Sequence, residues 1–261
     1  MATHAEHVLI STGKDDWKSK IEDEEEGTLP YHNVMISNSS FPATPSTSPA
    51  EGSVPASAFL LRSFRYVPSI PTDAPSIATF TRAFLLPTAL HRAHAALTPA
   101  QQAQLRRQPE LQRQFRGARE TTEILVLVCG HGGRDSRCGV MGPLLRAEFE
   151  EQLRAHNIRV LTGPPPAADT EAEQDRAARG HAPNARVGGI SHVGGHKFAG
   201  NVIVCVPPAF TTNPLAGKAI WYGRVGPEHV QGIVRETLLR GTVIKELFRG
   251  GTDVGGDILT L

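Results

Sequence analysis

The sequence predicts an α/β protein, and three observations in its second half support that prediction. Glu123–Cys129 (EILVLVC) is a continuous apolar run rich in β-branched residues, which is typical of a buried strand. Residues 141–156 follow, with apolar side chains at the spacing of a helix that packs one face on a core. A last amphipathic segment, residues 228–240, starts after Pro227, a residue that favours the first turn of a helix.

The first hundred residues give weaker signals. Residues 7–11 and 32–36 are predicted as short strands. Residues 37–57 are rich in Ser, Pro and Thr and hold little that could be buried, so they predict a flexible loop. Residues 59–87 regain apolar side chains but are broken by prolines, and residues 99–116 are predicted as a helix.

The order of elements after residue 120 predicts a thioredoxin-like domain. Such a domain requires a β-α-β unit, then a strand pair, then a helix. The remaining short apolar runs supply the strands, and residues 163–184 are predicted as a surface loop. The expected strands after the first helix are residues 158–161, 187–191, 202–206 and 219–225.

We therefore expect three regions. Residues 1–118 form an N-terminal half that contains the Ser/Pro-rich loop at 37–57. Residues 119–250 form the thioredoxin-like domain, and residues 251–261 are a C-terminal tail. A chain of 261 residues is long enough to bury a sizeable core.

Composition excludes several classes of protein. With 27 basic and 26 acidic residues, the net charge of +1 gives no reason to expect nucleic acid or an anionic membrane as the main partner. The longest apolar runs are too short to span a bilayer, and the N-terminal sequence shows no targeting signal. Three cysteines make no disulfide framework, which favours reduced thiols available to a metal.

Two glycine-rich stretches carry the candidate site. Cys129 and Cys138 are separated by eight residues in the first, and His192 and His196 by three residues in the second. Two thiolates and two imidazoles complete the set of ligands for either zinc or an iron–sulfur cluster. The spacing alone leaves both possibilities open, because His-x3-His also lies within the range of zinc sites.

The residues around these ligands resemble a known family. The stretches CGHGGRDSRCGVMGP, GGISHVGGHKFAGNVIV and IWYGRVGPEHVQGIV are similar to the fungal sucrase/ferredoxin-like family, in its altered-inheritance-of-mitochondria branch. Members of that branch carry a bis-histidinyl [2Fe–2S] cluster on a thioredoxin-like ferredoxin domain. The resemblance implies that Cys129 and Cys138 hold one iron and that His192 and His196 hold the other. It also implies that the N-terminal half is a shortened, partly irregular thioredoxin-like half.

The same resemblance implies an electron carrier rather than a catalyst with its own substrate. Its partner would be a redox protein or reductase, in mitochondrial redox homeostasis or thiol quality control, with the cytoplasm as the second location. The main alternative is a zinc-stabilised protein-interaction module. A thiol oxidoreductase that uses Cys129 and Cys138 directly is the weakest reading, because such enzymes place their cysteines two residues apart. The sequence names no electron donor or acceptor and no oligomeric state.

Two further residues are candidate ligands with simpler explanations. His131 lies two residues after Cys129, and we expect it to be a neighbouring or surface group rather than a ligand. Cys205 lies in the middle of an apolar run, so we expect a small buried packing residue.

Overall fold

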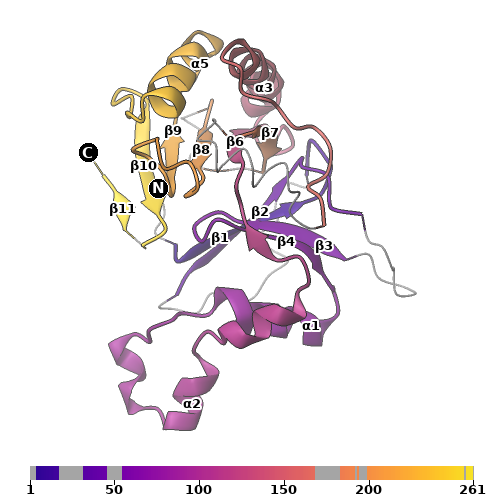
Figure 1. Cartoon of the computed structure of the whole chain (residues 1–261), viewed down its shortest axis with the longest axis vertical. Helices are drawn as coiled ribbons and strands as arrows, with labels where there is room; N and C mark the ends of the chain where they lie inside the picture. Colours follow the sequence, from indigo (N-terminus) through magenta and orange to yellow (C-terminus); the bar gives the residue numbers. More distant parts are fainter. Residues whose placement is uncertain are drawn as a thin grey trace.

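The computed structural model describes residues 4–17, 32–45, 55–167, 183–191, 193, 199–255 and 257–260. This part is a mixed α/β structure with one 11-stranded sheet in the order β11-β10-β9-β8-β6-β7-β2-β1-β3-β4-β5 (Figure 1). The strands are β1 (Glu6–Ser11), β2 (Val34–Ser39), β3 (Ala56–Leu60), β4 (Arg65–Ile70), β5 (Arg119–Glu120), β6 (Ile124–Cys129), β7 (Ala185–Ile190), β8 (Val202–Val206), β9 (Lys218–Tyr222), β10 (Phe248–Asp253) and β11 (Ile258–Leu259).

Few helices accompany the sheet. The α-helices are α1 (Ala74–Phe80), α2 (Pro99–Gln104), α3 (Ser136–Ala155) and α5 (Pro227–Ile233). Two of them, α1 and α5, continue into π-helical segments at Thr81–Leu85 and Val234–Leu239. Short 3-10 helices lie at Arg92–Ala96 and Pro109–Gln114.

The sheet consists of two halves with the same strand order. The order β2-β1-β3-β4 in the first half matches β7-β6-β8-β9 in the second. In each half the first two strands in sequence run parallel and the other two pairings are antiparallel. A helix follows each set, α1 after β4 and α5 after β9.

The two halves join through β2 and β7, which pair antiparallel at Ser39 and Ile190. These are the last residues of their strands, and their parallel neighbours are Ser11 in β1 and Cys129 in β6. The carboxyl ends of four strands therefore meet at one junction. Ligand sites of α/β sheets commonly lie at the carboxyl ends of strands.

Three apolar clusters form the core. One packs α3 and α5 against the second half of the sheet, and another packs α1 and its π-helical extension against the first half. The third lies between the halves and includes Phe41 and Phe59 from one and Leu127 and Ile203 from the other. Strand β6 contributes alternate side chains to the first and third clusters, so it is buried on both faces, as its continuous apolar run predicts.

Most of the predicted strands are confirmed, together with the helix after Pro227, and α3 begins earlier than predicted. The single helix predicted for residues 99–116 is wrong. Helix α2 ends at Gln104 and a separate 3-10 helix starts at Pro109, because a proline ring blocks the hydrogen bond that would continue a helix.

Three other expectations need correction. The predicted strand 158–161 makes only an isolated bridge from Val160 to Ala185, and three consecutive prolines follow closely. The predicted loop 37–57 includes the end of β2 and the start of β3, and its residues 46–54 lie outside the described part. The predicted tail 251–261 contains the end of β10 and all of β11, which extend the sheet.

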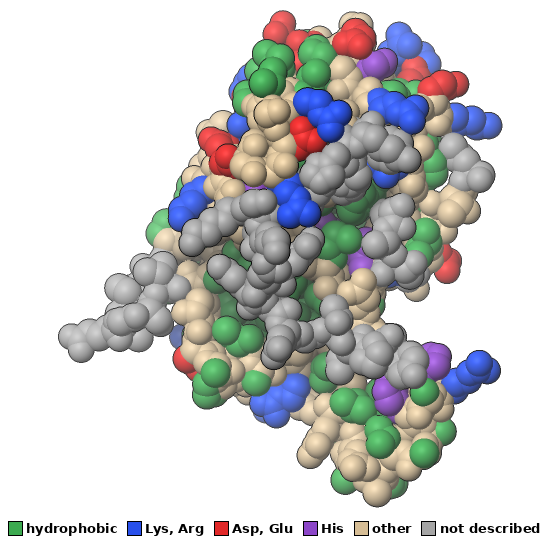
Figure 2. Space-filling model, turned by 180° about the vertical axis from the view of Figure 1, so that it is seen from behind, with side chains coloured by type: hydrophobic (Ala, Val, Ile, Leu, Met, Phe, Trp, Pro, Cys, Tyr) green, Lys and Arg blue, Asp and Glu red, His purple; other side chains and the backbone are tan. Residues whose placement is uncertain are grey.

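Within the described residues, no helix combines the length and apolar character needed to cross a membrane. On the face shown in Figure 2, basic and acidic side chains are interspersed at the end of the molecule that carries α3 and α5.

Candidate metal centre

Cys129 and Cys138 lie together at a strand-to-helix connection. Cys129 is the last residue of β6, and Cys138 is in the first turn of α3. The two side chains are hydrogen-bonded to each other, and both are buried in the cluster between the two halves. The sequence predicts this helix only from residue 141, so the position of Cys138 in its first turn is a correction.

Asp135 explains why the helix begins so early. Its carboxylate accepts a hydrogen bond from the Arg137 N–H at 2.9 Å, which satisfies one of the free donors of the first turn. The same carboxylate pairs with the Arg137 side chain at 2.8 Å. This cap starts α3 at Ser136 and thereby fixes the direction of the Cys138 side chain.

Glycines allow the start of α3 to lie directly against the loop that follows β6. A Cβ atom on Gly142 would lie 2.7 Å from the Gly130 Cα, and one on Gly139 would lie 2.9 Å from the Gly132 Cα. Cβ atoms do not approach other atoms so closely, so side chains at these positions would push the helix away. The glycine pattern of the sequence is therefore what lets the two thiols meet.

The Cys138 thiol is protonated in the absence of a metal. The hydrogen bond to Cys129, followed by burial, raises the pKa of Cys138 well above its ordinary value. Metal ions bind the thiolate, and a bound cation reverses this preference by stabilising the negative charge. Metal binding at this pair would therefore release protons.

The N-terminal half holds the loop between the cysteines. The Gly133 N–H donates to both carboxylate oxygens of Asp16, at 3.1 and 3.0 Å. On α3, Arg146 forms an ion pair with Asp15. Sequence reasoning missed this role for residues 15–17, because no local pattern links them to the loop after β6.

His131 is buried rather than exposed on the surface. Its Nε2 lies 2.9 Å from the Trp17 carbonyl oxygen, and its ring packs edge-on against Trp17 with 5.8 Å between ring centroids. A carbonyl only accepts, so Nε2 carries the proton and is not available as a metal ligand in this arrangement. His131 thus connects the loop to the N-terminal half.

The described residues at the end of β7 lie near the cysteines. Ser191 is tied to β2, because its N–H donates to the Asn38 carbonyl at 2.8 Å and its hydroxyl accepts from the Asn38 N–H at 3.0 Å. Val193 is buried in the same cluster as Cys129 and Cys138. The chain therefore leaves β7 beside Cys129, and the residues on both sides of position 192 are fixed there.

His192 and His196 themselves lie outside the described residues. Among the residues that are described, no three His, Cys, Asp or Glu side chains are grouped so that they could hold a metal ion. The hydrogen-bonded thiol pair consists of two of the four side chains that the sequence predicts as ligands.

Cys205 has the packing role that the sequence predicts. It lies in β8 opposite Leu125 and is fully buried. Burial raises the pKa of its thiol to about 12, so it stays neutral.

Comparison with known proteins identifies similar sequences. A profile described as sucrase/ferredoxin-like matches residues 1–250. Proteins named altered inheritance of mitochondria protein 32 are 40% identical over 131 residues in Meyerozyma guilliermondii and 43% identical over 128 residues in Clavispora lusitaniae. These matches cover 50% and 49% of this chain but only 36% and 35% of the relatives, so the matched part spans about a third of their length. No solved structure matches the chain.

Proposed function

Because the chain belongs to the sucrase/ferredoxin-like family, we propose that it carries a [2Fe–2S] cluster and transfers single electrons. Cys129 and Cys138 would hold one iron, and His192 and His196 the other. The observation that carries the proposal is the buried, hydrogen-bonded thiol pair at the end of β6. Cysteine thiolates are the usual ligands of such clusters, so the donor set fits.

The chain's own residues bind and shield the group. When bound, the cluster supplies one electron at a time, and imidazoles in place of two thiolates raise its potential. Asp135 orients Cys138 by starting α3, and Asp16 holds the intervening loop through Gly133. Apolar residues around both thiols exclude water, which tunes the potential of a metal centre.

We further propose that each half of the sheet is a thioredoxin-like unit. The support is the shared order of four strands, with one parallel pairing, two antiparallel pairings and a helix after the last strand. In the second half, α3 also connects the parallel pair β6 and β7, which completes the β-α-β unit. The N-terminal connection between β1 and β2 runs largely through residues outside the described part.

The physiological setting is a proposal from the relatives. Their name refers to mitochondrial inheritance, and we propose a mitochondrial role with a redox protein or reductase as the partner. A zinc-stabilised interaction module is the alternative, because the same four side chains satisfy the tetrahedral shell of zinc.

Metal and sulfide analysis of protein purified without oxygen tests the proposal. A red-brown protein with about two iron and two sulfide per chain is expected for the cluster. A colourless protein with about one zinc per chain would replace the proposal with the structural-zinc alternative.

A further inference from the structure

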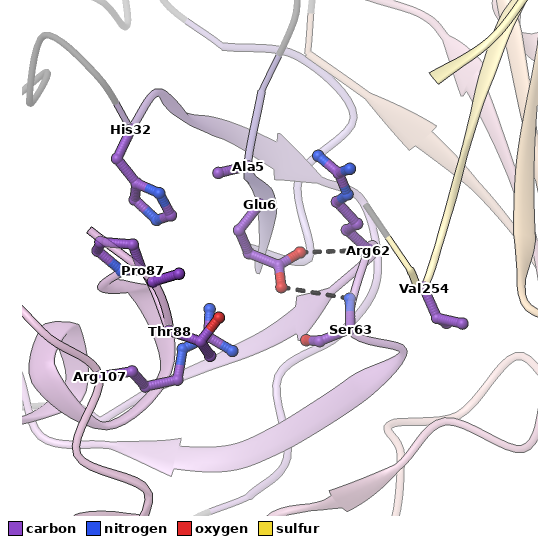
Figure 3. Close-up of a pocket in the computed structure, with 10 residues that line it drawn as sticks. Ala5, Glu6, His32, Arg62, Ser63, Pro87, Thr88, Arg107 and Val254 are labelled. Atoms are coloured by element: carbon purple, nitrogen blue, oxygen red, sulfur yellow. Dashed lines mark hydrogen bonds between the residues drawn. The ribbon is translucent and has the colours of Figure 1, made fainter. Parts of the chain in front are cut away.

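A cavity lies at the end of β1 that is remote from the cysteines (Figure 3). Its volume is about 360 Å³, and its walls come from the start of β1, the turn after β3, residues 87–89, Arg107 and Val254. This volume is within the range of small-molecule sites in proteins. Its charged lining residues are Glu6, Arg62 and Arg107, and the Arg62 guanidinium is already held by the His4 carbonyl.

Glu6 is fixed in the cavity by the backbone. Its Oε1 accepts hydrogen bonds from the His7 and Arg62 N–H groups at 2.9 and 2.8 Å, and its Oε2 accepts one from the Ser63 N–H at 3.2 Å. Figure 3 shows this carboxylate between the Arg62–Ser63 turn and the side that carries His32 and Arg107. Each carboxylate oxygen accepts about two hydrogen bonds, so Oε2 keeps room for another donor.

Arg107 faces the same space with unused donors. Its Nε donates to the Leu86 carbonyl at 2.8 Å, which fixes the guanidinium, and its terminal NH₂ groups make no hydrogen bond to any of the described residues. Burial lowers the pKa of Arg107, and the more distant Glu6 opposes that effect; the described residues form no direct ion pair with it. A half-buried guanidinium without a paired anion favours an anionic ligand.

His32 and two apolar residues complete the lining of the cavity. His32 Nε2 lies 2.6 Å from the Leu85 carbonyl oxygen, so this nitrogen carries the proton and Nδ1 is the acceptor of the ring. Pro87 and Val254 give the cavity apolar walls. Together the groups offer a cation for an anion, acceptors for a hydroxyl or amine, and a surface for a short carbon skeleton.

We propose that this cavity binds a small organic anion that also carries a hydroxyl or amino group. The anionic oxygens pair with the Arg107 guanidinium, and the hydroxyl or amine donates to Glu6. The site is separate from the proposed metal centre, because Glu6 and Ser11 are at opposite ends of β1, about 17 Å apart for a strand of this length. The proposal does not depend on the cluster.

Calorimetric titration of the full chain tests the proposal with five probes: L-malate, glycerol 3-phosphate, succinate, inorganic phosphate and glycerol. L-Malate and glycerol 3-phosphate each combine an anionic group with a hydroxyl, one as a carboxylate and the other as a phosphate. Succinate lacks the hydroxyl, and glycerol lacks the charge. We expect malate or glycerol 3-phosphate to bind. Succinate should bind at least about tenfold more weakly than malate, and inorganic phosphate at least about tenfold more weakly than glycerol 3-phosphate, because the Glu6 carboxylate is then left without the donor that the ligand hydroxyl supplies.

Substitutions test which residues bind the anion. Arg107→Gln should weaken binding at least about tenfold, and Arg107→Lys, which keeps the charge but loses the paired donors, should weaken it less. Arg106→Gln is the matched control, since Arg106 is the adjacent, exposed arginine. Glu6→Gln provides a second test if the Arg107→Gln protein does not fold, and it should reduce the preference for malate over succinate.

The proposal is overturned if folded wild-type protein binds neither malate nor glycerol 3-phosphate at about 10 mM, a concentration that would reveal even millimolar affinity. It is equally overturned if folded Arg107→Gln binds as tightly as Arg106→Gln, or, where Arg107→Gln does not fold, if Glu6→Gln leaves the preference for malate over succinate unchanged.

Discussion

Cys138 shows how a single position combines local and long-range causes. Its place in the first turn of α3 depends on the Asp135 cap, whereas its contact with Cys129 depends on packing between the loop and the helix. The high pKa of Cys138 follows from that contact and from burial. A thiol in this state is a poor nucleophile, which favours metal binding over direct thiol chemistry.

The three cysteines should differ in what they contribute. Cys129→Ser or Cys138→Ser should abolish the visible chromophore in folded protein, because a serine hydroxyl is a poor ligand for a soft metal site. Cys205→Ser should keep the chromophore and lower stability by about 1–3 kcal/mol through a buried hydroxyl. Visible absorption and urea unfolding measure the two effects. If only Cys205→Ser lost the colour, the assignment of the site to Cys129 and Cys138 would be wrong.

His7 should make the stability of the protein depend on pH. It is buried in β1, where its Nε2 bonds the Ser37 hydroxyl at 2.9 Å. Burial, with a smaller effect of His4, lowers the pKa of His7 to about 3 from an ordinary value of 6.5. Between these two pKa values the unfolded chain binds a proton at His7 that the folded chain does not bind. The contribution of neutral His7 to the free energy of unfolding is therefore complete above pH 6.5 and is lost as the pH falls toward 3.

Urea unfolding at several pH values between 7 and 4 measures this effect. The free energy of unfolding should fall by about 1 kcal/mol per pH unit in the wild type from this residue. His7→Gln should show a shallower slope, since glutamine does not titrate. Equal slopes in the two proteins would mean that His7 gains a proton without unfolding.

At the scale of elements, the packing of α3 on the loop after β6 is set by glycine. Gly142→Ala should displace the start of α3 and cost about 1–3 kcal/mol, because the new Cβ would lie 2.7 Å from the Gly130 Cα. Gly163→Ala is the matched control, since a Cβ there meets nothing within 4 Å. Urea unfolding should separate the two variants; similar stability would show that the helix moves freely.

The segment at 15–17 should control access to the cysteines. Asp16→Ala removes both hydrogen bonds to the Gly133 N–H and should increase the rate at which metal-free Cys129 and Cys138 react with iodoacetamide. Asp73→Ala is the control, because Asp73 also accepts a backbone hydrogen bond, from Ser76 at 3.0 Å, but at the distant start of α1. Mass spectrometry measures alkylation at each cysteine, and equal rates in both variants would contradict the role of Asp16.

At the scale of the molecule, the cysteines lie in the cluster that the two halves share. Phe41, Phe59 and Tyr66 from the first half pack in the same cluster as Cys129 and Cys138. Covering the thiols is thus a property of the whole sheet rather than of the second half. The antiparallel pair of β2 and β7 fixes how the halves face each other.

Residues 119–261 expressed alone should therefore be less stable than the full chain. Removing the first half exposes apolar side chains of Leu127, Ile203 and Trp221 that are otherwise buried, and apolar exposure costs about 25 cal/mol per Å². Thermal unfolding and binding of a hydrophobic dye compare the two proteins. A fragment as stable as the full chain would show that the halves fold independently.

The sequence alone determined the elements whose signal is local. The run EILVLVC predicts a buried strand because it is apolar on both faces, and β6 is buried on both faces. The helix after Pro227 is likewise confirmed, because its first turn and its apolar spacing are written in consecutive residues. Residues 99–116 were harder to predict, because their helix propensity is high throughout and only Pro109 marks the interruption.

Tertiary structure decided what depends on residues far apart in the chain. No local pattern links Asp16 to Gly133, or Ser39 to Ile190, since each pair is separated by more than a hundred residues and meets only when the two halves close. Cys129 and Cys138 could be selected from the sequence as candidate ligands, because cysteine is a residue type that binds metals. Their hydrogen-bonded contact, their burial and the raised pKa of Cys138 arise from packing between β6, α3 and the first half, which spacing does not specify.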